Sequence, residues 1–461
     1  MARKDWIFFA KAQESFYRQK SRIRWMEDGD TNTSFFFKSV VANHGRNCIK
    51  LLRDDDGESI QNVAQIKEML INYYQNLLGT VNQGVSPLSI VEIQDLVSFR
   101  CSSGLATQLI KVPTVEEIRD TMASMPKNKA PGPDGFPVEF YWEAWDVVGQ
   151  DLIKAVQGFF QSGCLPRNFN TTAITLIPKV QGADKMSQFR PVSCCTTVYK
   201  IIARLIKQKL KLFIRDAVQG NQVGFVQGRL LCENVLLASE LVTNFHAVGD
   251  TTRGCLQVDL AKAYDNLDWG FLLNVLQAIN LPEVFIGWLK QCFTTPTFSE
   301  AFNGELIGFF PGRKGLRQGD PISSLLFVLA MDILSKKLDR GAISSTYGLH
   351  PECEAPVVTH LSFADDVLIF FDGKQDSIHG IMSILEEFHT GTGLEVNRDK
   401  TALFLDGGNT QENSQLASSV GIQFGSLPVR YLGVPLSSKK MTRQDYKPLW
   451  IKFFPGSLLG L

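Results

Sequence analysis

Two apolar segments that run directly into aspartate are the feature of this sequence that most constrains its fold. The first is 255–258, which is followed by Asp259, and the second is 357–371, which carries Asp365 and Asp366 near its middle. A carboxylate inside an apolar strand costs free energy unless it is paired or binds a cation. We therefore expect two neighbouring strand units, the second a strand–turn–strand, that bring these three carboxylates together.

Three carboxylates gathered in this way predict an oxygen-rich site for Mg²⁺. Adjacent like charges raise each other's pKa unless a cation neutralises them, and hard divalent cations prefer oxygen ligands. Two such ions about 4 Å apart are the arrangement for in-line phosphoryl transfer. An Asp-Asp pair in a turn is more often a surface turn bonded to its own backbone. The apolar flanks and the matching strand before Asp259 favour a catalytic site instead.

The other periodic patterns predict an α+β chain with a mainly antiparallel sheet. Thr114 and Glu117 form a capping-box pattern at the start of a helix that ends before Pro126. Helices are expected at 15–25, 61–78, 114–125, 270–279 and 321–338, and strands at 172–178, 255–258, 298–310 (a hairpin) and 357–371. The polar stretch 79–112 is expected to contain a linker. Segment 127–137 holds three prolines and two glycines, so we expect a stiff ordered turn there.

Charge is balanced over the whole chain but concentrated locally. The formal net charge is +0, from 47 basic and 47 acidic residues, so nucleic-acid binding has to be sought in particular segments. Segment 173–215 has nine basic residues and one acid, Asp184, a net of +8. Such a run is usually a solvated helix face, but Lys179 and Arg190 lie in or beside predicted turns. Segment 1–50 is also basic, by about five charges.

Several protein classes are disfavoured by composition and pattern. The 44% hydrophobic content is typical of a globular protein. No apolar run approaches the length of a membrane span, and the N-terminus does not resemble a signal peptide. The nine cysteines show no CxxC pair and no zinc-ligand spacing, so we interpret them as buried hydrophobic residues of a reduced intracellular protein. His360 and His389 have no partner at ligand spacing and are interpreted as packing residues.

The residues around the aspartates resemble a known family. Segment 363–366, Phe-Ala-Asp-Asp, resembles the catalytic box of reverse transcriptases. The resemblance extends in order through 134–137, 176–179, 189–192, 221–222, 224–225, 228–229, 315–321, 393–397 and 431–435. Together these motifs resemble the non-LTR, LINE-type retrotransposon reverse transcriptases, plant-like in detail, over about 125–440. Segment 17–25 is similar to the region that precedes the polymerase in the same elements.

The resemblance implies a right-hand polymerase fold. Its fingers would span about 113–255 and its palm, with an antiparallel sheet, about 255–435, within a reverse transcriptase domain at 113–440. A basic helical N-terminal extension and linker would occupy 1–112, and 441–461 would be a truncated thumb start. We also expect the chain to lack the endonuclease domain of a full element.

The resemblance also assigns roles to particular residues. Asp259, Asp365 and Asp366 match the catalytic metal-binding triad, and the Leu260 carbonyl is expected to face a metal ion. Tyr264 matches the bulky residue that screens the sugar 2′ position, although a single tyrosine there would otherwise be interpreted as a core aromatic.

Further roles concern the substrate. Lys179 and Arg190 match the residues that hold the incoming triphosphate, as fixed cations do in phosphoryl transfer. Gln318 and Gly319 match the box that packs against nucleotide and template. Lys400 matches a possible proton donor to pyrophosphate, with a solvated lysine nearly as good an explanation. Segment 431–433 resembles the primer grip, and the loop at 129–137 is interpreted as structural, with template contact an alternative.

The expected function is that of an RNA-directed DNA polymerase using two Mg²⁺ ions, with Mn²⁺ as an alternative. The expected partners are an RNA template, a DNA primer and deoxynucleoside triphosphates, without a membrane, and the expected location is the nucleus. One alternative is a catalytically idle retroelement remnant that at most binds nucleic acid. Another is an RNA-binding protein similar to intron maturases, which would need a basic region after the primer grip.

Overall fold

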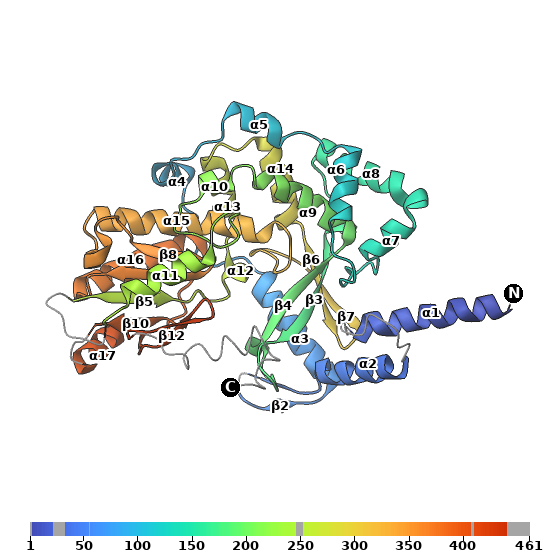
Figure 1. Ribbon diagram of the computed structural model, residues 1–461, viewed down its shortest axis with the longest axis horizontal. Helices are drawn as coiled ribbons and strands as arrows, with labels where there is room; N and C mark the ends of the chain where they lie inside the picture. The colour runs from blue at the N-terminus through green and yellow to red at the C-terminus, as the bar shows by residue number, and fades with distance from the viewer. Residues whose placement is uncertain (1, 22–32, 55, 246–251, 407–409, 440–461) are drawn as a thin grey trace, which may run out of the picture.

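Two main sheets, both covered by helices, form the molecule (Figure 1). This computed structural model describes residues 2–21, 33–54, 56–245, 252–406 and 410–439. The helices are α1 Ala2–Ser21, α2 Thr33–Asn47, α3 Val63–Leu78, α4 Ile90–Leu96, α5 Ser103–Leu109, α6 Val115–Ala123, α7 Val138–Glu143, α8 Trp145–Ser162, α9 Thr197–Leu210, α10 Ile214–Ala217, α11 Leu231–Leu241, α12 Ala263–Asn266, α13 Trp269–Ala278, α14 Glu283–Thr294, α15 Ser323–Ile343, α16 Gln375–Thr392 and α17 Thr410–Ser419. The strands are β1 Leu52–Arg53, β2 Ser59–Ile60, β3 Thr171–Pro178, β4 Phe189–Cys195, β5 Gly254–Val258, β6 Thr297–Phe302, β7 Glu305–Pro311, β8 His360–Phe363, β9 Asp366–Phe371, β10 Ala402–Leu405, β11 Gln423–Phe424, β12 Val429–Tyr431 and β13 Val434–Leu436. The α+β class expected from the sequence is confirmed.

The five-stranded sheet has the order β11-β10-β5-β9-β8, with β5 at its centre. All of its pairs are antiparallel except β10 with β11. Along β5, Leu256 and Val258 belong to the main core with α13, α15 and α16, whereas Cys255 faces a second core shared with α11 and β12–β13. The sheet is therefore buried on both faces, which explains the continuous apolar character of its strands.

The four-stranded sheet has the order β4-β3-β6-β7, in which β3 and β6 run parallel. Helix α3 covers one of its faces and buries Ile66, Leu70 and Tyr74 against it. The β6–β7 hairpin turns at Asn303 and Gly304, whose φ angles are 48° and 99°. Positive φ at both central residues is the turn geometry that matches the twist of a hairpin, so the predicted hairpin is confirmed.

Several local predictions are also confirmed, and one segment differs from its prediction. Thr114 Oγ1 accepts a hydrogen bond from the Glu117 N–H, and the Glu117 carboxylate accepts one from the Thr114 N–H. Helix α6 ends at Ala123, before Pro126. By contrast, the stretch expected to be a linker carries α4 and α5, and Ile93 and Leu109 are fully buried in the main core. The few hydrophobic residues of this segment pack into the main core and so attach the segment to the body of the protein.

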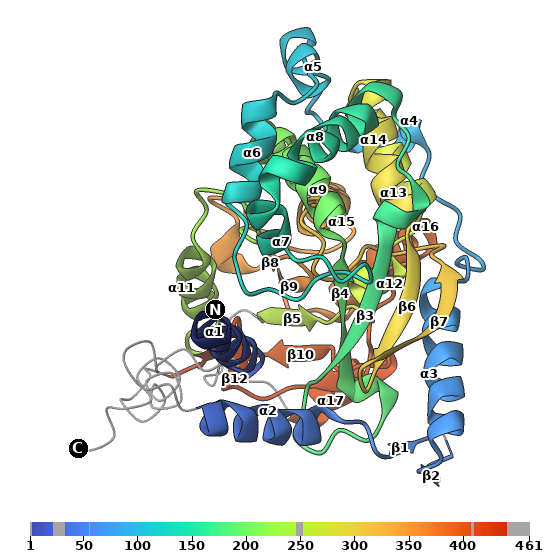
Figure 2. The same cartoon turned by 90° about the vertical axis from the view of Figure 1, so that its right-hand side faces the viewer.

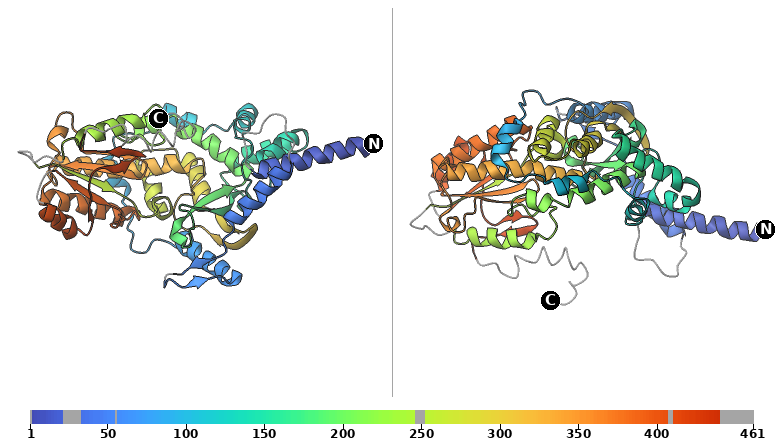
Figure 3. Two further views of the ribbon diagram at one scale, coloured as in Figure 1. Left: turned by 60° about the horizontal axis from the view of Figure 1, so that its bottom comes forward. Right: turned by 90° about the horizontal axis from the view of Figure 1, so that it is seen from above.

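The N-terminal helices α1 and α2 pack against each other and extend away from both sheets (Figures 1 and 3). The β1–β2 hairpin, which follows α2, contacts the body through Arg53, whose Nε lies 2.7 Å from Asp184 Oδ2 at the tip of the β3–β4 hairpin. The basic helix expected at 15–25 corresponds to the end of α1, and its residues after Ser21 lie outside the described part.

The loop between β7 and α15 is bonded to the four-stranded sheet. The Ser193 N–H of β4 donates to the Gln318 carbonyl at 2.8 Å. The neighbouring Arg317 guanidinium donates to Asn170 at 2.7 Å and to Thr172 of β3 at 3.0 Å. In Figure 1 helix α12 lies between β5 and β10 on one side and β3 and β4 on the other, and Figure 2 looks along this direction with β3 and β4 in front. The loop therefore joins the four-stranded sheet to α15, whose residues belong to the main core.

Candidate active site

A cavity of about 1200 Å³ lies where the two sheets meet. Its lining comes from the end of β5 and helix α12, from Asp365 in the β8–β9 turn, from the β3–β4 hairpin, and from the loop that leads into α15. Helix α3 closes one side with Tyr73 and Tyr74. A volume of this order accommodates a nucleotide-sized ligand together with part of a polymer.

The strand register brings the three sequence-predicted aspartates to one edge of the sheet. Val258 is paired with Val367, so the next residues along, Asp259 and Asp366, come opposite each other on the same face. Phe363 pairs with Asp366, which leaves Ala364 and Asp365 as a two-residue turn. Asp259 and Asp365 border the cavity, whereas the exposed Asp366 is outside its lining.

Burial and neighbouring negative charge raise the pKa values of Asp365 and Asp366. Loss of water around the carboxyl group, followed by the charges of Asp365 and Asp259, raises the pKa of Asp366 to about 6. Burial and the charge of Asp259 likewise raise the pKa of Asp365, against the lowering effect of Arg190. A bound cation would relieve this repulsion.

The residues at this edge fit a hard divalent cation by charge and by ligand type, since carboxylate and carbonyl oxygens are its preferred ligands. Asp259, Asp365 and the backbone of Leu260 are the groups that the structure places on the cavity. Over the described ranges, no three His, Cys, Asp or Glu side chains are gathered closely enough to hold a metal ion. The geometry therefore shows two carboxylates at the cavity and the third beside them.

The segment after α16 supports the end of β5. The Asn397 N–H donates to the Asp259 carbonyl at 2.8 Å, and the Asp259 N–H donates to Thr401 Oγ1 at 3.2 Å. Leu260 is bridged to Val396. Lys400 lies in the same segment and lines the cavity. Its Nζ is 3.9 Å from Asp259 Oδ1. The chain thus places a lysine beside the first aspartate.

Two cations from the four-stranded sheet line the same cavity as the aspartates. Lys179 follows β3, where its N–H donates to the Gln188 carbonyl and its Nζ to the Ser187 carbonyl, both at 2.8 Å. Arg190 of β4 is exposed and lines the cavity. Partial burial, then the charges of Lys400 and Arg190, lower the pKa of Lys179. A cluster of like positive charges in a cavity is suited to a polyanion such as a triphosphate.

Tyr264 lies in α12, between the aspartates and the main core. Its ring stacks on Phe327 of α15 with centroids 4.5 Å apart and planes at 15°. Burial, and then the charge of Asp365, raise the pKa of its hydroxyl. The residue lines the cavity although part of it packs on the core, so both interpretations made from the sequence describe part of its environment.

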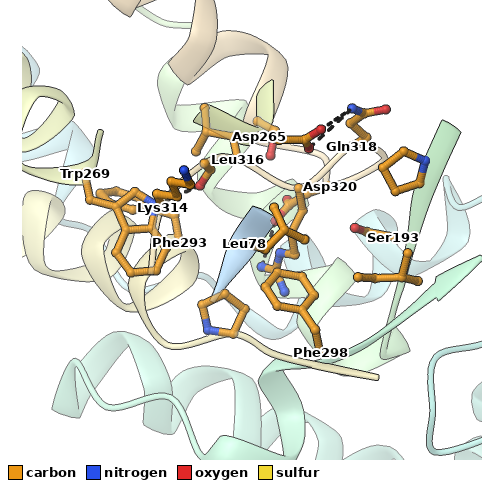
Figure 4. Close-up of a pocket in the computed structure, with 16 residues that line it drawn as sticks. Leu78, Ser193, Asp265, Trp269, Phe293, Phe298, Lys314, Leu316, Gln318 and Asp320 are labelled. Carbon is orange, nitrogen blue, oxygen red and sulfur yellow. Dashed lines mark hydrogen bonds and ion pairs between the residues drawn. The ribbon is translucent and has the colours of Figure 1, made fainter. Parts of the chain in front are cut away.

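Gln318 and Gly319 border the cavity on the loop before α15. The Gln318 Nε2 donates to both carboxylate oxygens of Asp265, at 3.4 and 3.5 Å, and Figure 4 shows its amide nitrogen turned toward Asp265 and its oxygen turned away. Gly319 has φ +104°, and a Cβ there would lie 3.2 Å from the Ser193 carbonyl oxygen. This close approach to β4 favours glycine.

The hairpin of β12 and β13 lies on the face from which Asp259 projects. Gln257, two residues before Asp259 and therefore on the same face, donates from Nε2 to the Arg430 carbonyl at 3.2 Å. Leu432 and Gly433 form the turn, with φ of 52° and 87°. Tyr431 is buried in the core behind it.

Two functional residues were not singled out by the sequence reasoning. Asp265 is buried beside the cavity, where burial raises its pKa to about 6 while Lys262 and the Gln318 hydrogen bond oppose this rise. Gln222 was noted only as part of a motif, yet its side chain bonds to the backbone of Ala364. His360, by contrast, is buried and bonded to Asn221 and Thr359, which agrees with a packing role.

Comparisons with known proteins add independent findings. Residues 177–436 match the sequence profile of the family described as reverse transcriptase (RNA-dependent DNA polymerase). The chain is 28% identical to the transposon TX1 uncharacterized 149 kDa protein of Xenopus laevis, over 93% of this chain and 32% of that protein. It is 23% identical to the retrovirus-related Pol polyprotein from the type-2 retrotransposable element R2DM of Drosophila melanogaster, over 77% of this chain and 31% of that protein.

A third relative is the RNA-directed DNA polymerase from mobile element jockey of Drosophila melanogaster, 23% identical over 71% of this chain and 35% of that protein. The chain thus spans about a third of the length of these curated relatives. Within the described ranges, none of the helices has both the length and the apolar character needed to cross a lipid bilayer.

Proposed function

The chain belongs to the reverse transcriptase (RNA-dependent DNA polymerase) family, and from this premise we propose that it adds deoxynucleotides to a primer 3′ end on an RNA template. The observation that carries the proposal is the arrangement around the cavity. Asp259 and Asp365, from the five-stranded sheet, line the same cavity as Lys179 and Arg190, from the four-stranded sheet. Acidic groups for a metal-bound reacting centre and cations for a polyphosphate are the two requirements of nucleotidyl transfer.

We assign the two halves of the molecule to a right-hand polymerase. The fingers would comprise about 113–255 and the palm about 255–435, within a domain at 113–440 that follows an N-terminal extension at 1–112. The five-stranded sheet that carries Asp259 and Asp366 supports the palm assignment, and the β3–β4 hairpin with Lys179 and Arg190 supports that of the fingers. The expected thumb start at 441–461 lies outside the described residues.

Asp259, Asp365 and Asp366, with the Leu260 carbonyl, are the groups that would hold two Mg²⁺ ions, and Mn²⁺ is an alternative. When bound, such ions lower the pKa of the attacking hydroxyl and neutralise charge on the leaving group. Burial and then the charge of neighbouring carboxylates raise the pKa values of Asp365 and Asp366, which supports this assignment because a bound cation would stabilise their charged forms.

Other side chains would hold the substrate. Lys179 and Arg190 bind the triphosphate oxygens, with Arg190 able to form a bidentate contact. Lys400, whose Nζ lies 3.9 Å from Asp259 Oδ1, would give a proton to the pyrophosphate as it leaves. These groups supply fixed positive charge where negative charge develops, which stabilises the transition state without reorganisation of water.

The remaining site residues would select the deoxynucleotide and align it with the template and primer. The Tyr264 ring, stacked on Phe327, would clash with a ribose 2′ hydroxyl and so favour deoxynucleotides. Gln318 and Gly319 would pack against the nucleotide and template. Segment 431–433 would position the primer 3′ end, since its hairpin is tied to the strand that ends at Asp259.

The partners proposed for this chain are an RNA template, a DNA primer and deoxynucleoside triphosphates, and the proposed location is the nucleus. Relatives named as retrotransposon Pol polyproteins and as an RNA-directed DNA polymerase support the class of reaction. A LINE-type element as the source is supported by the same names.

Primer extension tests the proposal. Purified chain would be given a primed RNA template, deoxynucleotides and Mg²⁺ at low salt, where phosphate contacts are strongest. We expect extension by the wild type and by Asp376→Asn, a control at an exposed carboxylate, and none by Asp365→Asn. A folded wild type that does not extend, or an Asp365→Asn variant that does, would reject the proposal in favour of a nucleic-acid-binding remnant.

A further inference from the structure

The Gln222 side chain makes a closed set of hydrogen bonds with the turn that carries Asp365. Its Oε1 accepts from the Ala364 N–H and from the Gly224 N–H, both at 2.9 Å. Its Nε2 donates to the Ala364 carbonyl at 3.3 Å. The side chain is 1% exposed, and it is not among the described side chains that border the cavity. Gln222 therefore contacts the backbone of the turn and not the space that a substrate would occupy.

Ala364 has a conformation that needs such support. Its φ is 56°, in the left-handed region that residues with a Cβ adopt at a cost of about 1 kcal/mol. Its N–H and carbonyl are one donor and one acceptor, both in the buried interior, and each needs a partner. A primary amide is the neutral side chain that offers an acceptor and a donor from one planar group, so glutamine satisfies both at once.

The backbone around Gln222 is itself fixed against the same turn. The Val223 N–H donates to the Ser362 carbonyl and the Ser362 N–H donates to the Asn221 carbonyl, both at 3.1 Å. A Cβ at Gly224 would lie 2.6 Å from the Ala364 nitrogen, so glycine permits this close approach. Arg229 adds a hydrogen bond of 2.6 Å to the Gln222 carbonyl. These contacts hold the backbone of Gln222 in a fixed position relative to the turn.

We propose that Gln222 is a positioning residue that holds Ala364 in its left-handed conformation and thereby sets the Asp365 and Asp366 carboxylates for catalysis. The inference rests on the proposed function, because it assigns to Gln222 an effect on the chemical step. Asp365 and Asp366 directly follow Ala364 in the chain, so a change in the Ala364 dihedral angles rotates both carboxylates relative to Asp259 on the neighbouring strand.

The test compares Gln222→Met, which keeps the length of the side chain and removes the three hydrogen bonds, with the wild type. We expect kcat for primer extension to fall about 30-fold, because misplacement of reacting groups by about 1 Å costs up to 100-fold. The KM for deoxynucleotide should stay within about threefold, since Lys179 and Arg190 are untouched. Gln157→Met is the control, because it removes a side-chain hydrogen bond to the Pro113 carbonyl far from the turn.

A second readout does not depend on activity. Amide hydrogen exchange at 362–366 should be faster in Gln222→Met than in the wild type and unchanged in Gln157→Met, because exchange reports local opening. Adding Ala364→Gly should restore part of the lost kcat, since glycine adopts positive φ without cost. If Gln222→Met does not fold, Gln222→Glu replaces it. In this buried position the carboxyl group is expected to be protonated, and it then offers an acceptor and a donor as the amide does, so a smaller loss of kcat is expected.

The outcomes separate the two proposals. An inactive wild type rejects the proposed function, while the exchange measurement still reports on the contact between Gln222 and Ala364. An active wild type with unchanged kcat and unchanged exchange in the Gln222 variant overturns the positioning role. A fall in kcat that Ala364→Gly leaves fully in place also overturns it, because the role acts through the conformation of Ala364.

Discussion

In the five-stranded sheet the carboxylates of Asp259 and Asp366 stand at strand ends beside a cavity, whereas in the four-stranded sheet the carboxylate of Glu300 stands in mid-strand beneath helix α3. Glu300 lies between Phe298 and Phe302 on the inward face of β6 and is 1% exposed. Neither of its carboxylate oxygens has a hydrogen-bond partner within the described residues. Its pKa is raised to about 7 by burial.

The comparison distinguishes two kinds of carboxylate. A bound ligand would stabilise the charged forms of the aspartates at the cavity, whereas the charged form of Glu300 lowers the stability of the fold. Asp259 and Asp365 face open space and the cations Lys179, Arg190 and Lys400. A Cβ at Gly308, on the neighbouring strand, would lie 2.5 Å from Glu300 Oε2, so Glu300 is packed closely and has no comparable space. A perturbed pKa is thus an indicator of function only where geometry also leaves room for a substrate.

The largest effect that this comparison predicts is on activity. Asp259→Asn should lower the rate of primer extension by at least about 10³-fold, or about 4 kcal/mol in the barrier, because the neutral amide cannot hold a divalent cation. The free energy of unfolding should stay within about 1 kcal/mol of the wild type, since the substitution also removes repulsion from Asp366. Single-turnover extension and urea unfolding measure the two quantities. A large loss of stability would show that Asp259 resembles a structural residue instead.

A buried carboxylate that has a partner gives the next largest effect. Asp320 is bonded to the Arg317 guanidinium at 2.8 Å and to the Tyr199 hydroxyl, and all three are buried. Arg317→Met should lower the free energy of unfolding by about 3 kcal/mol, because it leaves the Asp320 charge buried without its cation.

Urea unfolding of Arg317→Met and of Arg317→Met with Asp320→Leu checks this expectation. The double variant should lose less than the single one, because the orphaned charge is removed as well. Equal losses would indicate that the lost packing of the arginine, and not the buried charge, dominates.

Glu300 gives a smaller effect of opposite sign that depends on pH. The folded-state pKa of about 7 lies above the ordinary value of 4.5, so the folded protein binds more protons than the unfolded chain and loses stability as pH rises from 4.5 through 7. Glu300→Gln should therefore be more stable than the wild type at pH 8 by about 2 kcal/mol, with little difference at pH 4.5. Thermal and urea unfolding at both pH values measure the change.

Glu305→Gln, at an exposed carboxylate of the same hairpin, is the matched control and should differ from the wild type by less than about 1 kcal/mol at either pH. A wild type whose advantage over Glu300→Gln grows with pH would mean that Glu300 has a stabilising partner in its charged form.

The smallest effect concerns an ion pair at the cavity. Lys400 and Asp259 lie 3.9 Å apart with side chains 68% and 39% exposed, so Lys400→Gln should change the free energy of unfolding by less than about 0.5 kcal/mol. Arg253→Gln is the comparison, because Arg253 and Asp406 form a 3.2 Å pair that is 13% and 7% exposed, and should cost about 2 kcal/mol. Equal effects in unfolding experiments would show that burial does not distinguish these pairs.

Much of the fold could be predicted because the relevant signals are local. The capping box at Thr114 and Glu117, and the apolar runs that became β5, β8 and β9, depend on neighbours in the chain. The turn at Asp365, with Asp366 at the start of the next strand, followed from the apolar flanks of the pair. These patterns act through intrinsic preferences and burial periodicity, which a single sequence displays.

What could not be predicted depends on distant contacts. The sequence does not show that Gln222 reaches Ala364, nor that Gln318 bonds to Asp265, because each pair is joined only by the folded sheet. Phe298, Glu300 and Phe302 alternate as an inward-facing strand would, so an acid at an inward position was visible but not interpreted. Segment 79–112 was expected to contain a linker because its polar residues outnumber the few buried ones, such as Ile93, that anchor it.

The central place of β5 has a consequence for synthesis of the chain. Its neighbours β9 and β10 emerge from the ribosome only after helices α12 to α15, and for β10 also α16, have been made. During that interval an apolar strand with Leu256 and Val258 has two unpaired edges. Such a strand pairs readily with other chains, so the yield of folded protein should depend on chaperones and on the speed of translation between β5 and β10.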